Sequence, residues 1–411
     1  MLQRLGFPAV GPHRRFVTAI GIDAVGSGVF MPVSMLYFLA VTPLTLFEVG
    51  LAISLASLIS LPAGPWIGTR VDRIGAKRIL LAGNALQTVG FLAYLVVESF
   101  PAVLAWTVVV TLGRTAFWGA YGNIVAAISA PGERERWFGF LGALRNVGFA
   151  VGGLASGAAI TIGTDLAFGV VVAANAASYA LAFWLLLAVP GTTPQRHESM
   201  PGSWATVLRD RPYRLLVVAQ LGYSLPMMIL NFALPVYAMT VLELPGWVVG
   251  AVFTVNCLMV GLGQGLVVNA LTGRIRFRVL VLTQLVFAAS YLVFLGGGTL
   301  PVVAASLVLV LGGMVYTVAE LMGGPVLGAL SAEAAPEHLR GRYLSLIQLA
   351  WNVSGTVAPV LFAWLLDRGE SPLWVVMLGV AVVSTLVAVR LGAVLAQAAR
   401  PVTNRAESIT A

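Results

Sequence analysis

Four ionisable side chains lie well inside long apolar stretches of this sequence, where a charge is costly. They are Asp23, Arg114, Arg145 and Glu320. At the centre of a membrane helix such a residue costs about 2.5–3.5 kcal/mol on insertion scales, so it usually lines a cavity and pairs. A carboxyl group that alternates between an apolar site and a neighbouring guanidinium can load and release a proton. The chemistry predicted from these residue types is therefore reversible protonation.

The four residues lie at similar depths in their apolar stretches. At about 1.5 Å per helical residue, Asp23 lies roughly 12 Å past the start of the first stretch. Glu320 lies roughly 15 Å before the end of the tenth. Arg114 is near the middle of the fourth stretch, and Arg145 is eight residues into the fifth. We expect Asp23 to pair with Arg114 and Glu320 to be a second proton-coupling residue, with a static ion pair as the alternative.

Aromatic, amide and guanidinium groups in the same stretches could form a binding surface for a small molecule. Packing is the commoner role of an aromatic residue on a membrane helix, and buried amides also bond neighbouring helices. The candidate substrate-binding residues are Tyr37, Trp118, Arg145, Asn146, Asn231, Tyr237, Tyr316, Trp351 and Asn352.

The elements that must position these residues are membrane helices. The chain has 411 residues, of which 59% are hydrophobic and 10% charged, against about 45–50% and about 25% in soluble domains. An apolar run of about 20 residues spans a bilayer as a helix. An all-α membrane protein with 12 transmembrane helices is predicted, including a retained first helix. The spans are 16–40, 46–68, 78–98, 101–128, 138–162, 165–189, 214–240, 247–270, 279–297, 301–330, 343–366 and 373–396.

The distribution of positive charge predicts the orientation of these helices. With the N-terminus in the cytoplasm, 21 of the 24 lysines and arginines fall in cytoplasmic segments and one, Arg368, falls in an outer loop. Such a bias is typical of cytoplasmic loops. Both termini are therefore expected in the cytoplasm, the expected partners include membrane lipids, and the net charge of +8 needs no nucleic acid as an explanation.

An internal duplication is visible when the sequence is shifted. A shift of 200 aligns Gly50 with Gly250 and Tyr37 with Tyr237, and a shift of 206 aligns the fifth stretch with the eleventh. Six helices, a polar loop and six more helices predict two parallel repeats. We expect one six-helix bundle over 1–189, a cytoplasmic linker over 190–213 and a second bundle over 214–411.

The stretch "GTRVDRIGAKR", between the second and third predicted helices, is the most charge-dense of its length. With the twelve helices and the duplication, it resembles the loop signature of major facilitator superfamily transporters. That resemblance implies the major facilitator fold, with helices one, four, seven and ten around a central chamber. It also implies a cytoplasmic latch in which Asp72 meets the start of the eleventh helix, near Arg340. The candidate gating residues are Gly68, Asp72, Arg73, Gly75, Lys77, Arg78 and Arg340.

The resemblance further implies a secondary active transporter with alternating access. We expect a monomer in a bacterial inner membrane that exports small lipophilic, in part cationic, compounds by proton antiport. Proton-coupled transport of an organic anion or nutrient is the first alternative, because two arginines lie in the same region. A non-transporting receptor or a lipid scramblase is the second. No catalytic triad, phosphate loop or metal-ligand cluster is present in the sequence, which has one cysteine, so neither an enzyme nor a cofactor is predicted.

Overall fold

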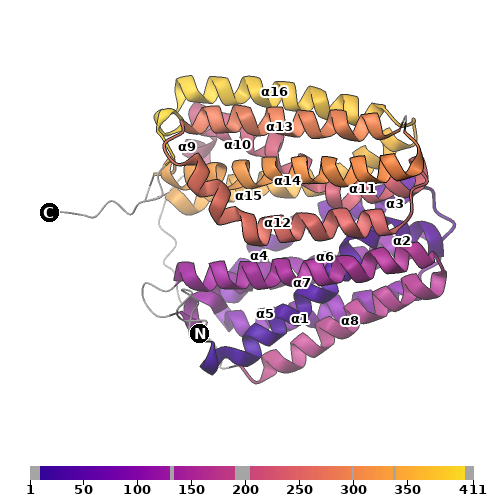
Figure 1. The fold of residues 1–411 in the computed structure, drawn as a ribbon. Helices are drawn as coiled ribbons and strands as arrows, with labels where there is room; N and C mark the ends of the chain where they lie inside the picture. The colour runs from indigo at the N-terminus through magenta and orange to yellow at the C-terminus, as the bar shows by residue number, and fades with distance from the viewer. Residues whose placement is uncertain (1–9, 130–133, 190–203, 299, 337–338, 403–411) are drawn as a thin grey trace.

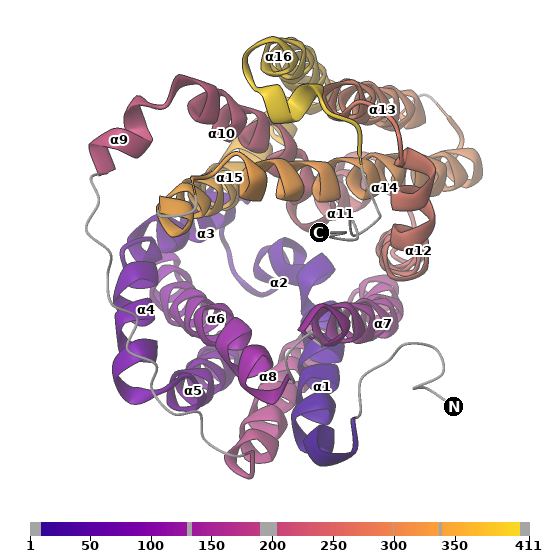
Figure 2. The same ribbon diagram turned by 90° about the vertical axis from the view of Figure 1, so that its left-hand side faces the viewer.

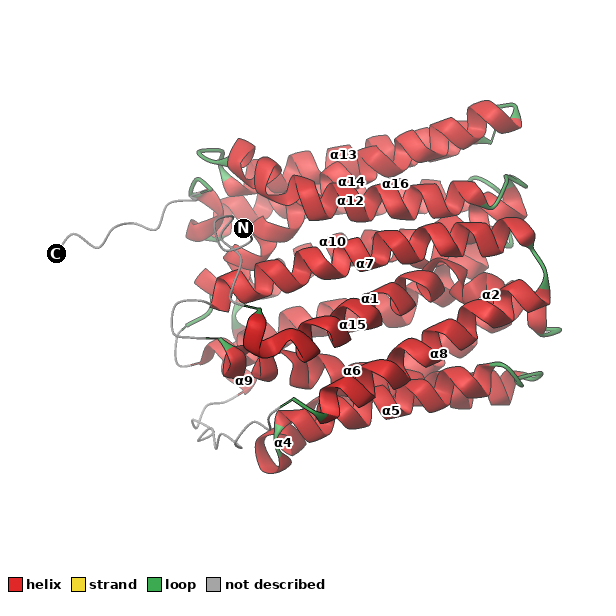
Figure 3. Ribbon diagram, turned by 60° about the horizontal axis from the view of Figure 1, so that its bottom comes forward, coloured by secondary structure: helices red, strands yellow, loops and turns green. Residues whose placement is uncertain are grey.

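The computed structural model describes residues 10–129, 134–189, 204–298, 300–336 and 339–402. Nearly all of this part of the chain is helical, and the long helices run roughly side by side (Figures 1 and 3). Apart from an isolated β-bridge between Ile275 and Pro401, the described residues form no β-strand.

The helices fall into an N-terminal half, up to residue 189, and a C-terminal half, from residue 204. The first half contains α1 (Arg14–Phe30), α2 (Ser34–Val41), α3 (Leu46–Ser60), α4 (Ala63–Ile74), α5 (Ala76–Tyr94), α6 (Phe100–Ile128), α7 (Arg134–Ile162) and α8 (Asp165–Leu187). The second contains α9 (Trp204–Arg209), α10 (Arg211–Ser224), α11 (Leu234–Val236), α12 (Trp247–Leu271), α13 (Arg276–Gly297), α14 (Val302–Glu333), α15 (Arg340–Leu366) and α16 (Pro372–Val394).

Ten helical segments in the described part of the chain are long and apolar enough to cross a membrane. The remaining two predicted spans are present but differ in form. The second is divided at residues 61–62 into α3 and α4, and the third is α5, which carries Lys77 and Arg78 in its first turn. The prediction of an all-helical fold with twelve spans is thus confirmed.

The first span of each half is irregular where a proline interrupts it. Pro32 lies in a short 3-10 turn between α1 and α2. In the C-terminal half Pro226 begins a similar turn, which is followed by π-helical segments at Ile229–Ala233 and Tyr237–Val241. Proline removes a backbone donor and clashes with the preceding turn. Both spans therefore lose regular α-helical geometry part-way along their length.

The two most extensive contacts between the halves are helix pairs, and both involve close contact of small residues. α3 lies beside α15 and α7 beside α12 (Figure 2). A Cβ on Gly50 would lie 2.6 Å from the Pro359 carbonyl oxygen, and one on Gly250 would lie 2.6 Å from the Cα of Gly157. Glycine thus lets the backbones of the two halves touch, as small residues do in membrane helix pairs.

These contacts lie toward one end of the bundle. We call the end where α1 begins and α16 ends the terminal end, and the opposite one the distal end. Gly50 and Gly250 are both near the distal end, four residues into α3 and three into α12. Toward the terminal end, several glycines of α4 and of the contacting helices α7 and α12 are in open space. A Cβ added to any of them would have no atom of the described residues within 4 Å: Gly64, Gly68, Gly139, Gly142 and Gly265.

The duplication also governs packing inside each half. Tyr37 donates a hydrogen bond of 2.7 Å from its hydroxyl to the carbonyl oxygen of Tyr94. Tyr237 donates one of 3.1 Å to the carbonyl oxygen of Phe294. Donors and acceptors are each 200 residues apart, the shift found in the sequence. The same bond therefore ties the first span to the third in both halves.

Candidate functional site

A buried ion pair lies where α1 packs against α7. A Cβ on Gly148 would be 2.7 Å from the Cβ of Ala24, and one on Gly28 would be 2.6 Å from the Cα of Phe149. This close packing brings Arg145, three residues before Gly148, next to Asp23. Its Nη1 donates to Asp23 Oδ2 over 2.8 Å, and both residues are buried.

Three aromatic rings surround the guanidinium of Arg145. Its Cζ atom lies 5.7 Å from the ring centroid of Phe117, 4.7 Å from that of Trp118 and 5.1 Å from that of Phe149. Each distance is within the range of a cation–π interaction. Trp118 is 50% exposed. The positive charge is therefore held by a carboxylate and by rings from α6 and α7. One of these rings, that of Trp118, is exposed.

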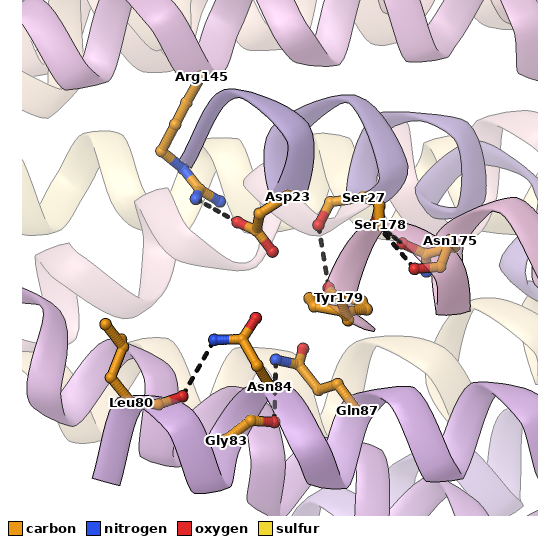
Figure 4. A network of polar contacts seen from close by, with 10 residues as sticks. All are labelled: Asp23, Ser27, Leu80, Gly83, Asn84, Gln87, Arg145, Asn175, Ser178 and Tyr179. Atoms are coloured by element: carbon orange, nitrogen blue, oxygen red, sulfur yellow. Dashed lines mark hydrogen bonds and ion pairs between the residues drawn. The ribbon is translucent and has the colours of Figure 1, made fainter. Parts of the chain in front are cut away.

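Amide side chains of α5 face Asp23 from the other side (Figure 4). Asn84 donates from Nδ2 to the Leu80 carbonyl oxygen over 3.0 Å, and Gln87 donates from Nε2 to the Gly83 carbonyl oxygen over 3.4 Å. Because the amino groups are bound to their own helix, the amide oxygens are left to face α1. Asn84 Oδ1 is buried and has no hydrogen-bond partner in the described part of the chain. The carboxyl group of Asp23 thus lies between a cation and hydrogen-bond acceptors.

The expected pair of Asp23 with Arg114 is replaced by the pair with Arg145. Arg114 lies on α6, which packs mainly against α5 and α3, and its side chain is exposed. The glycine-mediated contact of α1 with α7 brings Arg145, and not Arg114, within ion-pair distance of Asp23. Arg145, predicted as a substrate-binding residue, is therefore the structural partner of the first buried acid.

Glu320 lies on α14 in the C-terminal half, with neutral partners. Asn256 of α12 donates from Nδ2 to Glu320 Oε2 over 2.7 Å and to Thr317 Oγ1 over 3.0 Å. The Tyr223 hydroxyl donates to the backbone oxygen of Glu320 over 2.8 Å. Among the described residues, no lysine or arginine lies within ion-pair distance of the Glu320 carboxyl group.

Comparison with known proteins identifies the family. The family model described as Major Facilitator Superfamily matches residues 16–319. The chain belongs to the major facilitator superfamily. It is therefore an integral membrane transporter of small-molecule substrates and not an enzyme.

Relatives and solved structures each cover more than three quarters of this transporter. It is 24% identical over 389 residues to the class D tetracycline resistance protein of Salmonella ordonez, covering 90% of this chain and 93% of the relative. It is 26% identical over 339 residues to the multidrug resistance protein MdtH of Edwardsiella ictaluri (strain 93-146), covering 79% and 78%. The fold matches a nucleoside transporter NupG mutant with a TM-score of 0.77 at 11% identity, covering 93% of this chain and 100% of that one.

A second solved structure, a bacterial homologue of the iron transporter ferroportin in an inward-facing state, matches with a TM-score of 0.75 at 14% identity. It covers 93% of this chain and 99% of that one. At these identities both structures support the fold alone.

Three predicted substrate-binding tyrosines of this superfamily member are sealed in helix packing. Tyr37, Tyr237 and Tyr316 are at most 2% exposed. The Tyr316 hydroxyl donates to the Pro226 carbonyl oxygen over 2.9 Å, and the other two bond backbone oxygens as described above. A side chain that is buried and bonded in this way cannot contact a substrate in this conformation.

The other predicted substrate-binding residues are more accessible. Asn146 is partly exposed, donates to the Gly142 carbonyl oxygen over 3.0 Å and lies against Gly261 of the other half. Asn231, in the first π-helical segment, and Trp351 are also partly exposed, and Asn352 is exposed. Trp118 and these four remain candidates on accessibility.

The predicted gating segment has its own local structure. Gly75 has φ of 91°, a conformation that glycine adopts readily, and it separates α4 from α5. Lys77 donates from Nζ to the Leu187 carbonyl oxygen over 2.8 Å, so it joins α5 to the end of α8. Arg73 and Arg78 are exposed, and Gly68 faces open space. The side chains of Asp72 and Arg340 lie outside the described residues.

Several residues of the site escaped sequence reasoning. Asn256 donates to both Glu320 and Thr317, and Phe117 and Phe149 complete the rings around Arg145. A signal existed for two of them. Thr317 precedes Glu320 by three residues and Phe149 follows Arg145 by four, which places each pair on one helix face. Contacts between helices, such as that of Asn256, have no such signal in one sequence.

Proposed function

We propose that this transporter exports small lipophilic, in part cationic, compounds in exchange for protons. The observation that carries the proposal is a pair of membrane acids with different partners, the buried Asp23 bonded to Arg145 and the partly buried Glu320 bonded to neutral groups. Membrane acids of this kind mark ion pathways and proton relays. The names of the relatives, tetracycline resistance and multidrug resistance proteins, support drug export.

In this mechanism both acids change their protonation as the transporter changes its access. Ionised Asp23 is stabilised by Arg145, whereas protonated Asp23 releases the guanidinium. Glu320 with neutral partners can hold a proton without leaving an unpaired charge in the membrane. Arg114 is exposed on α6 and does not pair directly with Asp23, as was first expected. Its proposed role is to tune proton binding by Asp23 through its positive charge.

The contacts between the halves support an assignment of the conformation. Small residues close the distal end, whereas a Cβ added to Gly64, Gly68, Gly139, Gly142 or Gly265 toward the terminal end would meet no atom of the described residues within 4 Å. The excess of lysine and arginine in the segments at the terminal end favours the cytoplasm for that side. We infer an inward-facing state in a bacterial inner membrane, with residues 1–189 and 214–411 moving as two units joined by 190–213.

The gating segment fits the same cycle. When the terminal end closes, Asp72 would approach the start of α15 near Arg340, since helix N-termini favour anions. In the open state the nearby Tyr343 hydroxyl donates to Asp210 Oδ2 over 3.0 Å. Gly68 and Gly75 would allow close packing and the tight turn, while Arg73, Lys77 and Arg78 would be placed near lipid headgroups.

Proteoliposomes with a pH-sensitive dye in the lumen test the function. With an outward-directed proton gradient we expect uptake of ethidium or tetracycline in protein-containing vesicles and, at the same time, faster loss of protons from the lumen. Empty vesicles are the control. Flux of a lipid analogue without either effect would indicate a scramblase, proton movement with an organic anion alone would favour the first alternative, and binding without flux would indicate a receptor.

A further inference from the structure

We propose that Phe117, Trp118, Phe149 and Asp23 form a binding subsite for an organic monocation, and that Arg145 is an internal occupant which this substrate displaces. The inference rests on the proposed function, because it names the substrate class that the exporter takes. It goes further in assigning one subsite and one competitor within the chain.

The composition of the subsite carries the argument. Aromatic rings recognise quaternary ammonium groups and other organic cations through their negative faces, and the interaction strengthens away from water. Here three ring centroids lie 4.7–5.7 Å from one guanidinium carbon, and a carboxylate oxygen lies 2.8 Å from its Nη1. An organic cation needs these same two features, a set of rings and one negative charge.

Charge balance favours a cation over an anion at this place. An organic cation that replaces the guanidinium keeps the carboxylate of Asp23 paired. An organic anion bound to Arg145 would lie beside Asp23, and two negative charges would then share one buried site. Like charges at such a distance disfavour each other's charged forms.

The structure has space for the side chain of Arg145 when a substrate displaces it. Helical side chains lean toward the N-terminus of their helix, so Arg145 covers the turn that contains Gly142. Gly142 and Gly139 have open space around them. Phe138, in the same turn as Gly139, is 44% exposed. The guanidinium can therefore turn toward the terminal end, where the helices are apart, without leaving α7.

The site is also within reach of the contact between the halves. Asn146, the next residue after Arg145, lies against Gly261 of α12. Thr254 of α12 donates to the Ala150 carbonyl oxygen over 3.2 Å. Displacement of Arg145 would therefore occur on α7 itself, close to the contacts of α7 with α12 of the other half.

Tetraphenylphosphonium binding to the purified full-length protein, measured by calorimetry, tests the inference. Arg145→Gln removes the internal cation and leaves the rings and Asp23, so we expect a Kd about tenfold lower than in the wild type. Trp118→Leu added to Arg145→Gln should raise the Kd three- to tenfold relative to Arg145→Gln alone. Asp23→Asn added to Arg145→Gln should return the Kd to that of the wild type. An unchanged or higher Kd in Arg145→Gln overturns the proposal.

A matched control and a second variant complete the test. Arg368 lies over the ring of Trp364 at 3.6 Å, and no described acid is within ion-pair distance of it, so Arg368→Gln should leave the Kd unchanged. If Arg145→Gln does not fold, Arg145→Lys keeps the charge but lacks the planar group that stacks on rings. Its Kd should fall about threefold, and no fall in that variant overturns the proposal.

Flux in the same variants separates this inference from the proposed function. If proton-coupled export of neutral compounds persists while tetraphenylphosphonium affinity does not respond to Arg145→Gln or Arg145→Lys, the subsite is wrong and the function stands. If affinity responds as expected but no compound moves with protons in the wild type, the subsite stands and the function is wrong.

Discussion

Asp23, which is buried, and Glu320, which is partly buried, are membrane acids in opposite halves of one duplicated fold, yet their partners differ in kind. Asp23 bonds a guanidinium enclosed by aromatic rings, and Glu320 bonds the amide of Asn256. The halves nevertheless share their packing, since Tyr37 and Tyr237 make the same bond. The duplication has thus preserved the scaffold while the chemistry of the two halves diverged.

This difference assigns different tasks to the two acids. A carboxylate paired with a cation changes its protonation only together with the cation's position, because breaking the pair leaves a buried charge. A carboxyl group with neutral partners can change its protonation without moving another charge. We therefore expect the N-terminal acid to couple protonation to conformation and substrate, and the C-terminal acid to contribute a smaller, separable effect.

The largest expected effect is from Asp23→Asn. An amide cannot exchange a proton at this site, so proton-driven flux in proteoliposomes should fall at least a hundredfold, whereas exchange of neutral substrates without a gradient persists. The variant also leaves Arg145 buried without its partner, which costs roughly 3–5 kcal/mol in comparable pairs. Thermal unfolding should shift to lower temperature accordingly.

A double variant separates coupling from stability. Asp23→Asn with Arg145→Gln removes both charges, so the thermal stability should recover toward that of the wild type while proton-driven flux stays lost. If substrate flux in Asp23→Asn depends on the pH gradient as it does in the wild type, Asp23 has no part in proton coupling. The difference in task between Asp23 and Glu320 would then also be wrong.

Glu320→Gln should have the second largest effect. Glutamine still accepts the bond from Asn256, so the fold is retained, but the group no longer titrates. We expect proton-driven flux to fall about tenfold, with the Kd for tetraphenylphosphonium changed less than threefold. Glu333→Gln is the control on the same helix, because that acid bonds Arg276 near the terminal end, over 2.6 Å from Nη1. Equal losses in both variants would show that Glu320 has no specific role.

The sequence predicted the scaffold better than the site, for a physical reason. Spans follow from runs of apolar residues, and the shift of 200 residues already aligned Gly50 with Gly250. These are properties of one segment or of its repeat. Depth alone placed Arg114 and Arg145 equally well beside Asp23. The choice between them depends on which helix pair packs most closely, and the glycines of α1 and α7 decided it in the structure.

The same limit applies to the predicted binding surface. Residue type made Tyr37 and Trp118 equal candidates, but one is 2% and the other 50% exposed. The rotation of a helix about its axis decides such cases, and a span that is apolar all round does not define it. The partner of Glu320 was missed for a related reason, since Asn256 comes from another helix.

Gly250→Ala tests the closed distal end and should have a moderate effect. The added Cβ would lie 2.6 Å from the Cα of Gly157, so α12 and α7 must separate. The state that is open at the distal end should gain population several-fold, which distance measurements between spin labels on the two halves would detect. Gly50→Ala makes the equivalent change against Pro359. No shift in either variant would mean that these contacts do not hold the distal end closed.

The smallest expected effect is from the pair Tyr37→Phe and Tyr237→Phe. Each removes one hydroxyl that donates to a backbone oxygen, at 2.7 Å and 3.1 Å, and each leaves a buried ring in place. The loss should be about 1 kcal/mol of stability in each half, with flux and tetraphenylphosphonium affinity unchanged. Similar losses would support the view that the duplication preserves packing. A loss of flux in one variant alone would instead return that tyrosine to the functional site and show that the halves differ in their scaffold as well.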